Sequence, residues 1–329
     1  MRFVRMGREL LVRRHVTVIA LAISMVLSPV APLPARAATN WRAAVGAQTS
    51  DYSIQGLGFF PMELFVNLND SITWSWQANE IHTVTFVPAG MPTPPRTIAA
   101  TPDPSTWDGT TLVNSGVKTV DDPHPTFTVN FAKVGDFGYV CLVHPTTMTA
   151  TVHVLAANVR VPHDQAFYDR EGANEAQQIL ARGRDARRAS LNLAQQGGAT
   201  AVTAGGGAQT VFAAGIQTAF VARFLPQVRR VHQGDTVTWT LPDSFTPHTI
   251  TFGTAPNNAP TGLDGPGHAT INTNPLNQSI SSGVIRAGSP FSVKFTQEAG
   301  SYAYFCSLHF DLGMDGVIIV LPPGDSGDD

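Results

Sequence analysis

Short segments that alternate polar and apolar residues recur along most of the chain. Ser71–Trp76 and Thr151–Val154 place apolar side chains at every second position, and Thr83–Phe86 is rich in β-branched residues. Such segments are typical of strands with one buried face. Gly-Asp pairs at 135–136 and 234–235 supply turn residues between them. The pattern predicts an all-β fold built from many short strands.

Four segments of the first half of the chain recur in the second half with an offset of 165 or 166 residues. The matching segments are Phe59–Pro61 with Phe224–Pro226, Ser71–Trp76 with Thr236–Leu241, Ile81–Phe86 with Pro247–Phe252, and Phe137–His144 with Tyr302–His309. Because the offset holds to within one residue, the sequence contains two copies of one domain. Strands at this spacing predict a sandwich or barrel of about seven or eight strands per copy.

The repeats set the expected domain boundaries. Copy one covers 44–156 and copy two covers 210–322. The linker 157–209 is expected to hold an exposed helix over 164–196, followed by a flexible Gly-rich stretch. This helix would act as a spacer between the domains or pack on one of them. Residues 323–329 form an acidic tail.

The first 37 residues have the order of a secretory signal. Several Arg precede an uncharged run from Val16 to Leu27, and Ala35-Arg36-Ala37 follows as a small-x-small cleavage site. An uncleaved anchor is the alternative, but this run is short for the about 20 residues that a spanning helix needs. We therefore expect an exported protein, whether periplasmic, secreted or at the cell surface. No integral membrane segment is expected once the signal is removed, and the sequence leaves the export route, Sec or twin-arginine, open.

Composition narrows the functional classes. The 329 residues include 43% hydrophobic and only 14% charged residues, which is enough apolar material for two domain cores. Residues 1–37 hold six Arg and one Glu, so their removal changes the formal charge from −3 to about −8. An acidic chain is a poor candidate for binding nucleic acid or an anionic membrane surface.

Each copy contains four residues with metal-ligand chemistry. A His on an early strand is followed by Cys-x2-His and a Met within one later loop, with three residues before the Met in copy one and four in copy two. The two sets are His82, Cys141, His144 and Met148, and His248, Cys306, His309 and Met314. A thiolate, two imidazoles and a weak thioether suit copper in electron transfer.

Other interpretations of these residues explain less. An exported chain with two Cys would by default form a disulfide. Here Cys141 and Cys306 each begin a similar Cys-x2-His motif, 165 residues apart, which argues against a disulfide between them. Structural zinc sites favour several Cys in paired spacings and do not recruit Met. Buried Cys and Met can be ordinary core residues. That view does not explain why the same four residue types recur in register.

The phrase Tyr-x-Cys-x2-His-x3/4-Met, with an upstream His-Thr-(Val/Ile)-Thr-Phe, resembles the cupredoxins, and most of all the plastocyanin/azurin type of blue (type 1) copper protein. The resemblance covers 44–156 and 210–322 and implies two tandem Greek-key β-sandwich domains with one copper ion each. It implies two equatorial ligand sets with an axial Met in each: His82, Cys141 and His144 with Met148, and His248, Cys306 and His309 with Met314. It also implies exposed imidazoles at His144 and His309 as electron exits toward redox partner proteins.

One position departs from the family pattern. The family often carries Asn after the upstream His, bonded to a hydroxyl residue after the Cys. Thr83 and Leu142 stand at these positions in copy one, and Thr249 and Ser307 in copy two. Because the Leu142 side chain has no polar atom, we expect the first site to be held differently from the second.

The leading functional hypothesis is an electron carrier without enzymatic activity. Two-domain copper nitrite reductases and multicopper oxidases need further copper, held by His-x-His or by a His beside the Cys, and neither pattern occurs in the sequence. A copper storage or delivery protein is the main alternative. Such proteins usually expose Met-rich or His-rich clusters, whereas three of the seven Met here lie in the signal. The sequence favours electron exchange and leaves the donor, the acceptor, the reduction potentials and the oligomeric state open.

Overall fold

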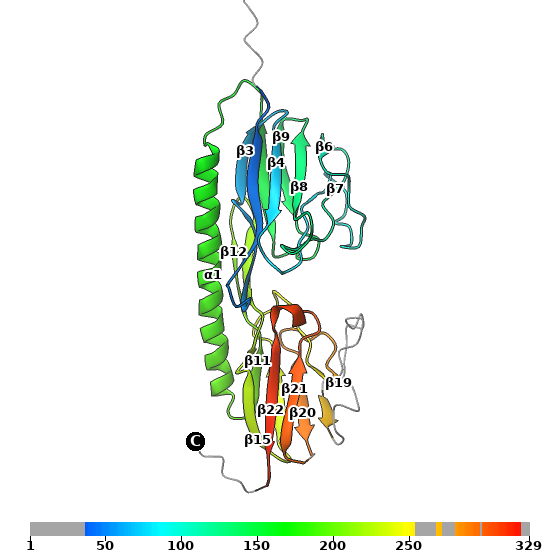
Figure 1. The fold of residues 1–329 in the computed structure, drawn as a ribbon, viewed down its shortest axis with the longest axis vertical. Helices are drawn as coiled ribbons and strands as arrows, with labels where there is room; N and C mark the ends of the chain where they lie inside the picture. The colour runs from blue at the N-terminus through cyan, green and yellow to red at the C-terminus, as the bar shows by residue number, and fades with distance from the viewer. Residues whose placement is uncertain (1–36, 254–267, 272–279, 297, 324–329) are drawn as a thin grey trace, which may run out of the picture. The chain divides into compact units, whose positions relative to one another are not determined.

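The computed structural model describes residues 37–253, 268–271, 280–296 and 298–323 (Figure 1). The predicted signal lies outside these residues except for its last position, and so does the predicted acidic tail except for its first. The described chain is mostly β, with one long helix, α1 (Gln165–Gln196), and a short 3-10 helix, η2 (Phe310–Leu312). Neither of these helices is long and apolar enough to cross a membrane.

Ten strands of copy one form two runs of five hydrogen-bonded neighbours, which we call its layers. Their bounds are β1 (Asn40–Gln48), β2 (Ile54–Phe60), β3 (Glu63–Asn67), β4 (Ser71–Trp76), β5 (Thr85–Phe86), β6 (Ser105–Trp107), β7 (Val113–Asn114), β8 (Thr126–Phe131), β9 (Gly135–Val140) and β10 (Thr149–Leu155). One layer has the order β6-β8-β4-β1-β2 and the other β3-β10-β9-β5-β7. Burial alternates along β4 and β10, as the period-two pattern of the sequence predicted, and it also alternates along β8.

Copy two has the same two layers as separate five-stranded sheets, β14-β11-β16-β20-β18 and β15-β22-β21-β17-β19. The strands after α1 are β11 (Ala201–Ala204), β12 (Gly207–Val211), β13 (Ile216–Val221), β14 (Phe224–Leu225), β15 (Val228–His232), β16 (Thr236–Thr240), β17 (Thr251–Phe252), β18 (His268–Ile271), β19 (Ile280–Ser281), β20 (Phe291–Phe295), β21 (Gly300–Phe305) and β22 (Asp315–Leu321). The stretch after α1 was expected to be flexible, but it contributes β11 and β12.

The hairpin of β12 and β13 joins the sheet of copy one. Strand β13 pairs with β2 along four residues and with β10 at one, so it links the two layers of copy one into a twelve-stranded sheet. The pairing is symmetric with respect to the repeat. Ile54 pairs with Val221, and Gly56 pairs with Ala219. With the repeat offset of 165, Ile54 corresponds to Ala219 and Gly56 to Val221. Each copy therefore offers the same strand segment to the other.

Side chains of copy two also enter the core of copy one. Phe220 and Leu312 are buried within the apolar cluster of copy one. Arg223 donates hydrogen bonds to the carbonyl oxygens of Leu312, at 2.6 Å, and of Asp51. The loop that carries the second Cys-x2-His phrase is therefore held against copy one.

Helix α1 packs along strands of both copies, including β1 and β2 of copy one and β11 of copy two (Figure 1). The side chain of Asp164 caps its N-terminus by accepting a backbone hydrogen bond at 2.8 Å. Glycines allow the close approach: a Cβ at Gly183 would lie 2.3 Å from Cγ2 of Ile54, and one at Gly172 would lie 2.9 Å from the backbone of Phe60. The helix thus contacts both copies rather than one.

Glu175 of α1 gives the fold a predicted pH dependence. Its carboxylate accepts hydrogen bonds from the Met62 amide at 2.9 Å and from Gln217 at 3.0 Å. Burial nevertheless raises its pKa from 4.5 to about 7. Because the folded-state pKa is the higher one, the unfolded chain releases this proton first. The folded state therefore loses stability as the pH rises through this range.

We expect Glu175→Gln to remove about 1–2 kcal/mol of that loss, allowing for the partial exposure of the group. Urea unfolding at about pH 4.5 and about pH 7.5 measures the loss of stability between the two pH values. The drop in unfolding free energy should be smaller in the variant than in the wild type. Glu298→Gln, on an exposed carboxylate, is the control. Equal drops in all three proteins would rule out a raised pKa at Glu175.

Candidate metal centres

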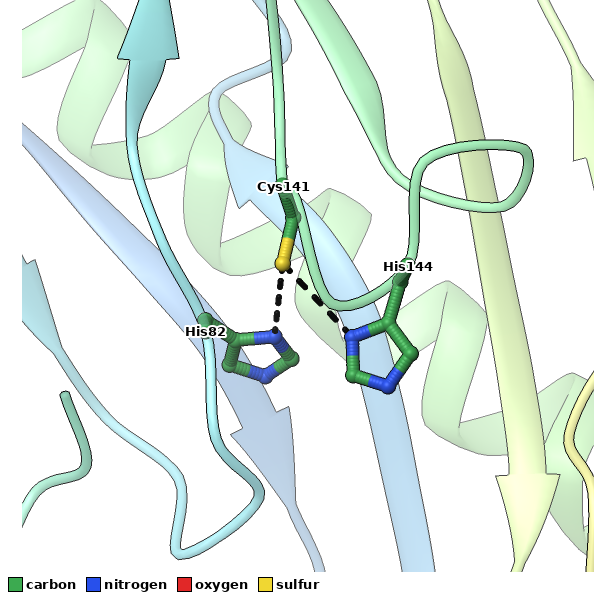
Figure 2. A group of neighbouring side chains, drawn as sticks. All are labelled: His82, Cys141 and His144. Atoms are coloured by element: carbon green, nitrogen blue, oxygen red, sulfur yellow. Dashed lines mark hydrogen bonds between the residues drawn. The ribbon is translucent and has the colours of Figure 1, made fainter. Parts of the chain in front are cut away.

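Three side chains from two segments of copy one meet at one point (Figure 2). Cys141 directly follows β9, His144 lies in the same loop, and His82 precedes β5, where it pairs with Lys118 in an isolated β-bridge. The Sγ of Cys141 lies 3.8 Å from Nδ1 of His82 and 3.6 Å from Nδ1 of His144. Both imidazole Nδ1 atoms therefore face one sulfur, as the ligands of a single ion do.

Copy two repeats this arrangement. The Sγ of Cys306 lies 3.8 Å from Nδ1 of His248 and 3.5 Å from Nδ1 of His309. The two Nδ1 atoms are 3.1 Å apart. In each copy the structure brings together the three nitrogen and sulfur donors that the sequence pattern selected, all within 4.8 Å of one another.

Met148 and Met314 close the two loops onto the cysteines. The Met148 carbonyl accepts a hydrogen bond from the Cys141 amide at 3.1 Å, and the Met314 carbonyl accepts one from the Cys306 amide at 2.9 Å. Each Met is fully buried in the same apolar cluster as its Cys. The longer second loop contains η2, which ends at Gly313 with a φ of 75°. Both loops thus return to the Cys alike, and the axial role of the two Met remains a prediction.

Backbone amides hold both sulfurs. The Thr83 amide donates to the Sγ of Cys141 at 3.3 Å, and the Leu142 amide donates to Oγ1 of Thr83 at 2.8 Å. In copy two, the Thr249 amide donates to the Sγ of Cys306 at 3.4 Å, and the Ser307 amide donates to Oγ1 of Thr249 at 2.7 Å. The backbone tie is therefore the same in both copies, because it uses the N–H of Leu142 or Ser307. The expected difference lies in the side chain: only Ser307 has a hydroxyl here, and it hydrogen-bonds with Oγ1 of Thr251 at 3.1 Å.

Both thiols favour the thiolate form. Burial opposes ionisation of Cys141, but hydrogen bonds with His144 and His82 and their positive charge hold its pKa well below the usual range. For Cys306, burial is likewise outweighed by the charge of His309 and by hydrogen bonds with both imidazoles, and the pKa is again well below the usual range. A buried anionic sulfur with two facing nitrogens is a site prepared for a cation.

The donor chemistry fits a copper ion. A thiolate with two imidazole nitrogens suits copper or zinc, whereas calcium and magnesium take oxygen ligands. The Nδ1 of His82 faces the sulfur, so it is the nitrogen available to an ion, while its Nε2 is buried without a hydrogen-bond partner among the described residues. The same buried region holds a Met in each copy, which favours copper over zinc.

Comparison with known proteins agrees with this chemistry. Residues 210–321 match the family of copper binding proteins named plastocyanin/azurin. The second copy belongs to the plastocyanin/azurin family. The first cupredoxin-like copy carries the same Cys-x2-His phrase and the same two layers of strands. The paired clusters are consistent with two type 1 copper ions, one in each copy.

Solved structures of amicyanin and plastocyanin are also similar to parts of the chain. An oxidized amicyanin mutant is 19% identical over 38% of this chain and 83% of its own, with a TM-score of 0.24. Oxidized plastocyanin from Dryopteris crassirhizoma is 20% identical over 37% of this chain and 99% of its own, with a TM-score of 0.23. A comparison with curated proteins gives no match.

The cupredoxin resemblance implied exposed electron-exit imidazoles at His144 and His309, and this expectation was wrong. His144 is only 8% exposed and His309 only 5%. The ring of Phe220 lies 5.1 Å from that of His309, and the carboxylate of Glu80 lies beside both imidazoles. Phe220 thus covers the imidazole of His309, and Glu80 of copy one lies against the imidazoles of both copies.

Sequence patterns also missed two glycines behind the upstream histidines. Gly46 and Gly205 both have left-handed φ angles, of 73° and 76°. A Cβ would lie 2.8 Å from Nε2 of His82 at Gly46 and 2.4 Å from Nε2 of His248 at Gly205. Each imidazole therefore rests against backbone that only glycine can provide. The two glycines are 159 residues apart, so the main repeat offset did not align them.

Proposed function

We propose that the protein is an electron carrier with two type 1 copper centres, each in a Greek-key β-sandwich domain. The proposal rests above all on the doubled set of one Cys and two His whose donor atoms gather in both copies. Copper bound there would supply a one-electron Cu(I)/Cu(II) couple. The residues that would hold it are His82, Cys141 and His144 with Met148, and His248, Cys306 and His309 with Met314.

The residues around each set suit a carrier because they keep the donors in one arrangement. Backbone amides fix each sulfur, and Gly46 and Gly205 let the upstream imidazoles pack directly against the chain. The Cys and His of both sets are buried, so few solvent molecules reorganise when the charge of a centre changes. Fixed ligands and little water keep the barrier to moving an electron low.

Burial also supports a carrier over a copper storage or delivery protein. A protein that releases copper needs ligands that an acceptor can reach, whereas the His of both sets are at most 8% exposed. The sequence has no His-x-His and no His beside either Cys, which argues against the extra copper of two-domain oxidoreductases. We further propose that the protein acts outside the cytoplasm and exchanges electrons with redox partner proteins there.

Spectroscopy and voltammetry of the copper-loaded protein test this function. We expect two copper ions per chain, intense thiolate-to-copper visible absorption, small EPR hyperfine splitting and a reversible one-electron response from each centre. Copper bound without a reversible response would contradict the carrier function. Rapid loss of that copper to a chelator would favour storage or delivery instead.

A further inference from the structure

One buried carboxylate lies between the two candidate metal centres. The Oε1 of Glu80 is 3.3 Å from Nε2 of His144, and its Oε2 is 4.0 Å from Nε2 of His309. The side chains of all three residues are at most 8% exposed. Each oxygen of a single carboxylate thus faces a histidine from a different copy.

The orientation of the two imidazoles makes this contact chemically specific. Both rings turn Nδ1 toward their own cysteine sulfur, so Nε2 is the nitrogen that faces Glu80. An imidazole that binds a metal through Nδ1 keeps its proton on Nε2. In the metal-bound form, both rings would therefore present an N–H to the same carboxylate. An acceptor of this kind fixes the tautomer and the ring orientation of a metal-binding histidine.

The carboxylate comes from copy one alone. At the repeat offset of 166, Glu80 corresponds to Thr246 of copy two. Thr246 is buried, and its hydroxyl has no hydrogen-bond partner among the described residues. Copy two thus has no acidic side chain of its own at this position, and His309 depends on the other copy for its carboxylate.

We propose that Glu80 is a positioning residue shared by both metal centres and that it joins them into one unit. This inference rests on the proposed copper sites. The carboxylate holds the Nε2–H of His144 and attracts that of His309, so it orients one ligand of each centre. The same contacts form a continuous chain between the sulfurs, whose steps are Cys141 to His144, His144 to Glu80, Glu80 to His309, and His309 to Cys306.

The test measures copper affinity at each centre separately. Cys306→Ala leaves only the first centre and Cys141→Ala leaves only the second. Each background is made with and without Glu80→Gln. Competition for copper(I) with a chromophoric chelator gives the affinities, and thermal unfolding of the metal-free proteins verifies that they fold. We expect Glu80→Gln to lower the copper affinity of the first centre by about 10- to 100-fold, the usual effect of losing such a carboxylate. The affinity of the second centre should also fall, but by less, because the 4.0 Å between Glu80 and His309 exceeds a hydrogen bond.

Controls separate a shared role from a general disturbance. Glu298→Gln makes the same chemical change at an exposed position and should leave both affinities unchanged. Glu80→Asp keeps the charge but draws the oxygens back, so a smaller loss at both centres is expected, and this variant serves if Glu80→Gln does not fold. A second readout is the reduction potential, which should rise at both centres in Glu80→Gln because removal of a nearby anion favours Cu(I).

A loss confined to the first centre would overturn the shared role, and so would unchanged affinity at both. The affinity measurement needs no redox cycling. If Glu80→Gln weakens copper binding at both centres but the wild-type protein gives no reversible redox response, the carrier function is refuted and the role of Glu80 stands.

Discussion

Replacing Cys141 by serine is expected to reduce the bound copper from two ions per chain to one. The Cys141 thiol has a pKa well below its usual range, so it offers copper a thiolate. A serine hydroxyl stays protonated at neutral pH, and its hard oxygen is a poor ligand for Cu(I). Metal analysis gives the copper count, and the thiolate-to-copper absorption should fall by the contribution of one centre.

Cys306→Ser is the matched variant, because it makes the same change in the other copy. It should likewise retain one copper ion, and the spectra of the two variants should add up to that of the wild type. The double variant should hold no copper against a chelator. Retention of both ions and of the full absorption in Cys141→Ser would show that this sulfur is not a ligand.

Gly205→Ala is expected to abolish tight copper binding at the second centre and to destabilise the fold by about 3 kcal/mol. The new Cβ would lie 2.4 Å from Nε2 of His248 and 2.9 Å from the carbonyl oxygen of Val221. Either the imidazole must leave its position or the strand must shift. The φ of 76° adds backbone strain for any residue with a side chain. Chemical denaturation and copper analysis measure the two effects.

Gly198→Ala separates backbone strain from the clash. Gly198 has a similar φ of 85°, but a Cβ there would have no atom within 4 Å. This variant should lose only about 1 kcal/mol of stability and keep both copper ions. If Gly205→Ala behaves like Gly198→Ala, the imidazole of His248 does not depend on the glycine behind it.

The sequence was sufficient for the donors but not for what surrounds them. Cys141 and His144 are close in the chain, and the repeat marks His82 as their partner, so residue types and spacing were enough. The amide of Leu142 could not be found in this way, because every residue except proline has such a donor. Glu80 could not be found either, since a carboxylate present in one copy gives no repeat signal. Its place two residues before His82 was the available clue.

The contact between the copies was also outside what the pattern could predict. Ala201–Ala204 and Gly207–Val211 consist largely of small residues, which carry little periodic signal and suggested a flexible linker. Their strand conformation depends on partners far along the chain, such as β16 for β11. The expectation of exposed histidines was wrong for the same reason. A repeat shows that there are two copies, but it does not show which faces they present to each other.

The pairing of β2 with β13 is the kind of contact that two identical subunits make across a two-fold axis, because each copy offers the same segment to the other. A single-domain ancestor could therefore have formed this contact as a homodimer before duplication and fusion. Identical subunits, however, must place the same residue on both sides. Two glutamates would then crowd the same pair of histidines, and mutual repulsion would keep one of them protonated. Fusion removes this constraint, because one half of the chain can keep Glu80 while the other carries Thr246.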